Sequence, residues 1–115
     1  MADAHTALVR EIYKACEKRA DVFVWKNNTG MAKMGRRFVR FGLPGSGDLI
    51  GLTTDGTFIS IEVKIPPDTQ NEDQVAFEQM VCRLGGYYII AHSVMDVIAF
   101  LDMRTYTRKG KDSVQ

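Results

Sequence analysis

The segment from residue 48 to residue 65 constrains the fold most strongly, because its sequence predicts a β-hairpin. Two strand-like stretches, 48–53 and 57–65, are joined through Asp55-Gly56, which is a strong turn signal. Because side chains alternate along a strand, the second stretch has two different faces. One face carries Ile59, Ile61, Val63 and Ile65, and the other carries Phe58, Ser60, Glu62 and Lys64.

The length of the hairpin loop decides whether Asp48 and Glu62 lie on the same face of the sheet. A two-residue loop would place the two carboxylates on opposite faces. A three-residue loop over 54–56 pairs Asp48 with Glu62, and Gly56 supplies the left-handed residue that this loop needs at its third position. A bulge near Gly47 could also bring the carboxylates together. We predict the three-residue loop.

The rest of the chain alternates between helical and strand patterns. In chain order, these patterns predict a helix at 4–19, a strand at 21–26, a loop at 27–35, a short strand at 37–41, a helix from Asn71 to the Gly85-Gly86 C-cap, a strand at 87–91 and a helix from Ser93 to about Met103. The helix after Asn71 is expected to bury Val75, Met80, Val81 and Leu84. The apolar run at 87–91 is typical of a central strand that is covered on both faces. Without the short strand at 37–41, the elements follow the order α-β-β-β-α-β-α, which predicts an α/β sandwich around a central mixed sheet.

Length and composition predict one domain, 1–104, followed by a polar and flexible tail, 105–115. The N-terminal residues lack the apolar region of a signal peptide, and no apolar run is long enough to cross a bilayer. Cys16 and Cys82 fall inside expected helices and have no metal-ligand spacing, so we interpret them as buried thiols in a reducing compartment. We therefore expect a cytoplasmic protein without membrane contact.

Charge is segregated along the chain, although the net charge is only +1. The stretch 26–40 holds five basic residues and no acidic one, whereas 41–80 holds seven Asp or Glu against one Lys. Such a pattern suits a surface that binds phosphates, although a solvated loop would look the same. The candidate DNA-binding residues are Lys26, Asn28, Lys33, Arg36, Arg37 and Arg40, with Asn27 and Thr29 as further neutral partners of phosphate. Trp25 is expected in the core rather than on a surface that stacks against bases.

Asp48, Glu62 and Lys64 could together carry chemistry on a phosphate. Two carboxylates on adjacent strands can hold Mg²⁺, which takes one or two protein carboxylates and leaves room for water and substrate phosphate. A lysine two residues after the glutamate lies on the same face and can act on the attacking water or the phosphate. Each residue alone has a structural explanation: a turn residue, a solvated strand face or, for Gln74, a helix cap.

Four motifs occur in an order that resembles the VRR-NUC (virus-type replication-repair nuclease) domain, a branch of the PD-(D/E)xK nucleases. They are Gly45-Ser46-Gly47-Asp48, Ile61-Glu62-Val63-Lys64, Gln74 and Gly85-Gly86-Tyr87. The resemblance extends from about Trp25 to Leu101 and implies a restriction-endonuclease-like fold. It departs from the family at Gly47, where proline is common, and we expect this glycine to loosen the turn before Asp48.

The resemblance also implies a metal site. Its ligands would be Asp48, Glu62 and the backbone carbonyl of Val63, with Lys64 catalytic and Gln74 supporting the site. A further acidic ligand is expected from the first helix. Glu11 is our choice and Glu17 the alternative, although a glutamate there could equally be a surface residue.

The implied activity is a structure-selective DNA endonuclease that depends on Mg²⁺ or Mn²⁺. Stand-alone members of the family resemble Holliday-junction-resolving enzymes that act on branched DNA as homodimers, and the family suggests a virus or mobile element as source. The alternatives are a flap or nicking endonuclease of the same fold, a non-catalytic DNA-binding subunit, and a protein-interaction domain without a nucleic-acid role.

Overall fold

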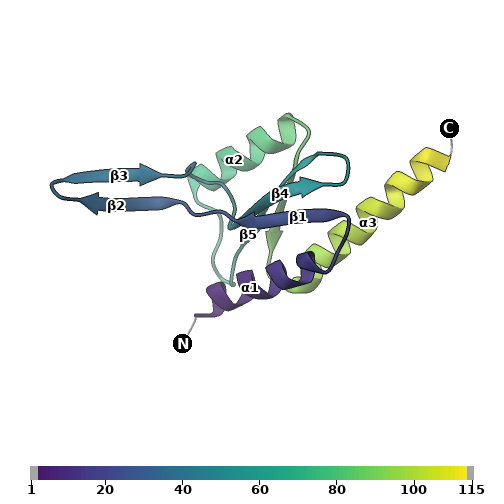
Figure 1. The fold of residues 1–115 in the computed structure, drawn as a ribbon, viewed down its shortest axis with the longest axis horizontal. Coiled ribbons are helices and arrows are strands. Elements are labelled where there is room, and N and C mark those ends of the chain that lie inside the picture. The colour runs from purple at the N-terminus through teal and green to yellow at the C-terminus, as the bar shows by residue number, and fades with distance from the viewer. Residues whose placement is uncertain (1–2, 114–115) are drawn as a thin grey trace.

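A four-stranded sheet forms the centre of the molecule, whose computed structural model describes the backbone of residues 3–113 and the side chains of residues 3–104 (Figure 1). The elements in chain order are α1 (Ala4–Glu17), β1 (Val22–Lys26), β2 (Gly30–Met34), β3 (Arg37–Phe41), β4 (Leu49–Thr53), β5 (Phe58–Val63), α2 (Glu72–Arg83), β6 (Tyr87–Ala91) and α3 (Val94–Ser113). None of the helices in this part of the chain is long and apolar enough to cross a membrane.

The sheet is mixed, as the sequence predicted, and it is covered by helices on both faces. Its strand order is β1-β4-β5-β6; the β1–β4 and β4–β5 pairs are antiparallel, and the β5–β6 pair is parallel. In Figure 1, α2 lies on one side of the sheet, and α1 and α3 lie together on the other. The fully buried side chains between α1, α3 and the sheet include Ile12, Leu49, Ile59, Ile61 and Leu101.

The β4–β5 hairpin has the register that we predicted. Leu49 pairs with Ile61, so one further step along the strands places Asp48 opposite Glu62. The three-residue loop is confirmed by Gly56, whose φ of +79° is the left-handed conformation that glycine tolerates best. Local turn chemistry therefore sets the register of the two strands that carry the carboxylates.

A second, two-stranded ribbon replaces part of the loop that we expected at 27–35. Residues 30–34 form β2, which pairs antiparallel with β3, the strand expected at 37–41. Figure 1 shows this ribbon extending well away from the sheet and its helices. The prediction of a loop was wrong because pairing with β3 satisfies the backbone of 30–34, whereas its Gly, Met and Ala residues give no strand signal of their own.

The burial of several apolar residues differs from our expectation. α2 buries Phe77 and Val81, whereas Val75 is 37% and Leu84 69% exposed, because the helix contacts the sheet through a narrow stripe. Trp25, expected in the core, is 44% exposed, because β1 is an edge strand of the sheet. The free thiol of Cys82 is exposed rather than buried, while that of Cys16 is buried as expected; burial raises the pKa of the Cys16 thiol to about 11.

The C-terminal half of the fold also differs from the expectation in two respects. β6 lies at the edge of the sheet and not at its centre, although α2 and α3 both contact it. α3 continues to Ser113, beyond its expected end near Met103. The flexibility of the polar tail at 105–115 stays a prediction, and residues 114–115 lie outside the described part of the chain.

Candidate metal and phosphate site

Asp48 immediately precedes β4, where a tight turn sets its position. Asn27 holds this turn, because its Nδ2 donates to the Gly47 carbonyl and its backbone N–H donates to the Asp48 carbonyl, both at 2.9 Å. The Gly47 N–H donates to Ser60 Oγ at 3.0 Å. A Cβ atom at Gly47 would lie 2.6 Å from the Ile61 carbonyl oxygen. Gly47 therefore allows a close fit against β5 and does not produce the looser turn that we expected.

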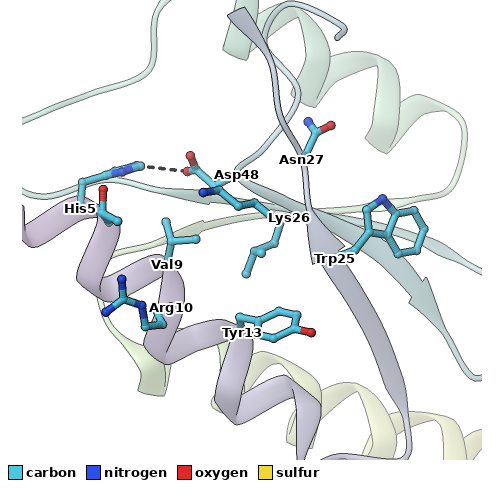
Figure 2. Close-up of a pocket in the computed structure, with 10 residues that line it drawn as sticks. His5, Val9, Arg10, Tyr13, Trp25, Lys26, Asn27 and Asp48 are labelled. Carbon is cyan, nitrogen blue, oxygen red and sulfur yellow. Dashed lines mark hydrogen bonds and ion pairs between the residues drawn. The ribbon is translucent and has the colours of Figure 1, made fainter. Parts of the chain in front are cut away.

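The Asp48 carboxylate contacts one group from β5 and one from α1. The Val63 N–H donates to Asp48 Oδ2 at 2.8 Å, and His5 Nε2 lies 3.3 Å from the same oxygen. Figure 2 shows the His5 side chain reaching from the first turns of α1 to the carboxylate. The residue of the first helix that reaches this site is therefore a histidine.

The structure does not bring Glu11 or Glu17 to Asp48. Glu11 is exposed, and it lies about 120° around the helix from His5 at 3.6 residues per turn. Glu17 is also exposed, and it lies about 18 Å further along the helix axis than His5. Helical geometry thus places neither glutamate where we expected an acidic ligand.

Glu62 is almost fully buried beside two polar partners. Gln74 Nε2 donates to Glu62 Oε1 at 3.0 Å, and Lys64 Nζ lies 3.9 Å from the same oxygen. Gln74 also forms a reciprocal capping box with Asn71 at the start of α2. The two functions that the sequence suggested for Gln74, a helix cap and a support of the glutamate, are therefore compatible in one side chain.

Lys64 follows β5 directly, and the neighbouring strand fixes its backbone. Its N–H donates to the Ala91 carbonyl at 3.0 Å, and His92 Nδ1 lies 2.9 Å from the Lys64 carbonyl. Because a carbonyl can only accept, His92 Nδ1 carries the proton in this contact. The Lys64 side chain is only 14% exposed, so its ammonium is held near Glu62 and does not extend into solvent.

The electrostatics of the carboxylate pair suit a divalent cation. Burial, with a smaller contribution from the negative charge of Asp48, raises the pKa of Glu62 to about 8, while the Lys64 ammonium acts in the opposite direction. A cation between the carboxylates would offset their repulsion, and Mg²⁺ needs only one or two protein carboxylates. Within residues 3–104, no group of three or more His, Cys, Asp or Glu side chains is arranged to hold a metal, so the fit rests on this pair.

A cavity of about 370 Å³ adjoins the site between α1 and β1. Asp48 and His5 are among the residues that line this cavity, and Arg10, Tyr13 and Lys26 also line it. In Figure 2 the Lys26 side chain extends from β1 toward α1 and Asp48. A phosphate that approached Asp48 from this side would therefore encounter two cations.

The expected DNA-binding residues are exposed, but most of them do not line this cavity. Lys26 ends β1 and Asn28 follows it, whereas the four other basic residues belong to the projecting ribbon: Lys33, Arg36, Arg37 and Arg40. The structure assigns Asn27, which we expected to contact phosphate, to the turn before Asp48.

Sequence reasoning missed both histidines of the site. His5 and Asp48 are 43 residues apart, and no spacing rule connects a residue on a helix to a turn so distant in the chain. His92 reaches Lys64 only because β6 pairs with β5, and that pairing joins segments that the helix α2 separates. Comparisons with protein-family models and with curated proteins find no match for this chain.

Proposed function

We propose that the protein is a metal-dependent DNA endonuclease of the VRR-NUC type, with a restriction-endonuclease-like fold, that acts on branched DNA. The observation that carries this proposal is the assembly of Asp48, Glu62 and Lys64 at one end of the β4–β5 hairpin. Asp48 is close enough to Glu62 to contribute to the raised pKa of Glu62, and the Lys64 ammonium lies beside Glu62. A protein that only bound DNA would gain nothing from two carboxylates placed beside a polyanion.

Each residue has a defined role in this proposal. Asp48 and Glu62 would hold Mg²⁺ or Mn²⁺, with the backbone carbonyl of Val63 as a further ligand. The bound cation would lower the pKa of a water molecule and offset negative charge on the phosphate. Lys64 orients the attacking water or places a positive charge beside the phosphate. His5 and Gln74 hold the two carboxylates in orientation through the contacts described above.

The proposal includes a homodimer that acts on junctions. Within its described residues, 3–113, one chain provides a single candidate site. Symmetric cutting of two strands in a four-way junction requires two sites that are related by a twofold axis. A second copy of the chain is the simplest source of the second site.

The decisive experiment measures cleavage of labelled four-way junction, flap, single-stranded and linear duplex DNA with Mg²⁺, with Mn²⁺ or with EDTA. We expect cutting that requires the metal, prefers the junction, and falls about 10²–10³-fold in Lys64→Met, because one charge that stabilises the transition state is removed. Glu62→Gln should abolish cutting. Arg83→Ala, at an exposed position of α2, is the control and should cut like wild type.

Two results would contradict the proposal. If all substrates remain intact with either metal while the folded protein binds DNA, the protein is a binding subunit and not an enzyme. If it neither cuts nor binds DNA in a salt-sensitive way, the nucleic-acid function itself fails.

A further inference from the structure

The projecting ribbon exposes a large apolar surface. We call residues 30–41 the arm; they comprise β2, β3 and the turn between them, and all ten strand residues are exposed. An isolated two-stranded hairpin is only marginally stable in water. Its large apolar side chains include Phe38 at 68%, Met34 at 64% and Met31 at 55% exposure. Such a surface suits contact with a partner.

The charge of the arm identifies the kind of partner. The arm contains four cationic side chains and no acidic one: Lys33, Arg36, Arg37 and Arg40. Near its tip, each face pairs one cation with one apolar side chain, because Lys33 pairs with Phe38 and Met34 pairs with Arg37. Two such arms would repel each other, so pairing with the arm of a second copy is unfavourable. A polyanion with apolar groups between its charges fits this pattern, and DNA has that chemistry.

The composition of the arm also favours one mode of contact with DNA. Its sequence has no Asn, Gln, Ser or Thr, the neutral side chains that commonly read base edges in the major groove. Five residues per strand give a ribbon about 17 Å long, comparable to five base-pair steps. Architectural proteins insert apolar side chains such as Phe and Met into base steps from the minor groove and place cations on the adjacent phosphates.

We infer that the arm enters the minor groove of duplex DNA and inserts Phe38 at a base step, with Lys33 and Arg40 on neighbouring phosphates. This inference rests on the proposed function for the identity of the ligand as DNA. Unstacking a base step is unfavourable in a continuous duplex and less unfavourable where stacking is already interrupted. The arm therefore contributes to structure selectivity, because a nick or branch point accepts Phe38 more readily than an intact duplex does.

The test measures binding in EDTA, where the proposed cleavage cannot occur. Fluorescence anisotropy compares a nicked duplex with an intact duplex of the same sequence, and 2-aminopurine beside the nick reports unstacking. We expect Phe38→Ala to weaken binding to the nicked duplex about tenfold, to change binding to the intact duplex much less, and to abolish the 2-aminopurine signal. Phe38→Leu should keep most of the preference, because it retains an apolar wedge.

The matched control is Val39→Ala, which truncates an apolar side chain of the same strand on the opposite face of the arm. It should leave both affinities within about twofold. Lys33→Ala should weaken binding to both duplexes equally and reduce the slope of log K against log salt by about 0.9, as expected when one phosphate contact is lost.

Three results would overturn the inference. One is an unchanged preference for the nicked duplex in Phe38→Ala. The second is an equal loss of preference in Val39→Ala. The third is conversion of a dimer into a monomer by Phe38→Ala in sedimentation, because the arm would then contact a second copy. Failure of the nuclease proposal is distinguishable, since it would appear as absent cleavage with metal while the 2-aminopurine signal persists.

Discussion

At the scale of single residues, the ionisation of Glu62 connects the candidate site to the stability of the fold. Its pKa rises from an ordinary value of 4.5 to about 8 in the folded protein. Below about pH 4.5 the group is protonated in both states, whereas at higher pH the unfolded chain loses the proton that the folded protein still holds. We therefore expect the melting temperature in EDTA to fall as pH rises from about 5 to about 8.

Glu62→Gln isolates this contribution, because glutamine keeps the shape of the side chain and cannot ionise. Its melting temperature should change less with pH over the same range, as measured by differential scanning calorimetry. Added Mg²⁺ should stabilise wild type more at about pH 8 than at about pH 6, since the ligands must lose their protons to bind it. Equal pH dependence in wild type and variant would show that Glu62 does not titrate as we infer.

The contact between His5 and Asp48 leads to a second prediction at this scale. Mg²⁺ prefers oxygen ligands, so we assign His5 to holding Asp48 rather than to the metal itself. His5→Ala should raise the Mg²⁺ concentration for half-maximal cleavage about 10–100-fold, the usual effect of removing a partner of a metal-binding carboxylate. Metal titrations of cleavage measure this change.

Glu11→Ala is the matched control for His5, because Glu11 lies on the same helix but not at the site. It should leave the metal requirement unchanged. A larger effect of Glu11→Ala than of His5→Ala would restore the acidic ligand that the family resemblance implied and would contradict the placement described above.

At the scale of elements, Arg104 joins α3 to the turn of the β4–β5 hairpin. Its Nη2 donates to Asp55 Oδ1 at 2.6 Å and to Thr53 Oγ1 at 3.0 Å, and its guanidinium lies 5.0 Å from the centre of the Tyr87 ring. Arg104→Leu should lower the free energy of unfolding by about 2 kcal/mol, since a charge-assisted contact is lost and Asp55 is partly exposed. Urea denaturation of Arg104→Leu and of the exposed control Arg83→Ala tests this, and a change within about 0.5 kcal/mol in both would refute it.

The helices and strands also show which parts of the fold could be predicted from local sequence. The hairpin register was predictable because a single glycine, Gly56, determines the loop type, and the two ends of α2 were predictable from Asn71 and the glycines after Arg83. The position of β6 was not predictable. An edge strand that is covered by a helix on each face has the same apolar pattern as a central strand. The apolar pattern reflects the burial of the two faces and does not depend on the number of neighbouring strands.

The residues of the candidate site also form two groups, one that local sequence predicted and one that it did not. Asp48, Glu62, Lys64 and Gln74 come together through one hairpin and one capping box, which are local features. His5, His92 and Asn27 join them through contacts that depend on the packing of α1, the pairing of β6 and the path of the turn before β4. Sequence patterns therefore predicted the proposed reacting groups but not the groups that hold them.

At the scale of the whole molecule, the candidate site and the arm belong to different parts of the chain. The site rests on the sheet and on both helical layers, whereas the arm extends away from them (Figure 1). In our proposals, cleavage and recognition of DNA structure thus depend on separate residues. Variants of the arm should alter which DNA is bound without altering metal dependence, and variants of the site should do the reverse.

The proposed homodimer permits a test that combines both sites of the assembly. Mixing wild type with an excess of Glu62→Gln subunits would give dimers with one active and one inactive site. On a four-way junction that is held in a supercoiled plasmid, wild type should cut two strands within one binding event and produce linear DNA. The mixed dimer should produce nicked circles, because only one of its two sites can cut.

The ratio of linear to nicked product, measured by gel electrophoresis at early times, distinguishes the possible assemblies. A twofold dimer predicts that linear product falls with the square of the wild-type fraction, while total cutting falls only in proportion to it. The subunits must exchange before DNA is added, which a tagged Glu62→Gln chain verifies by co-purification. If exchange occurs and linear product falls only in proportion to the wild-type fraction, each chain acts alone and the dimer is not the active species.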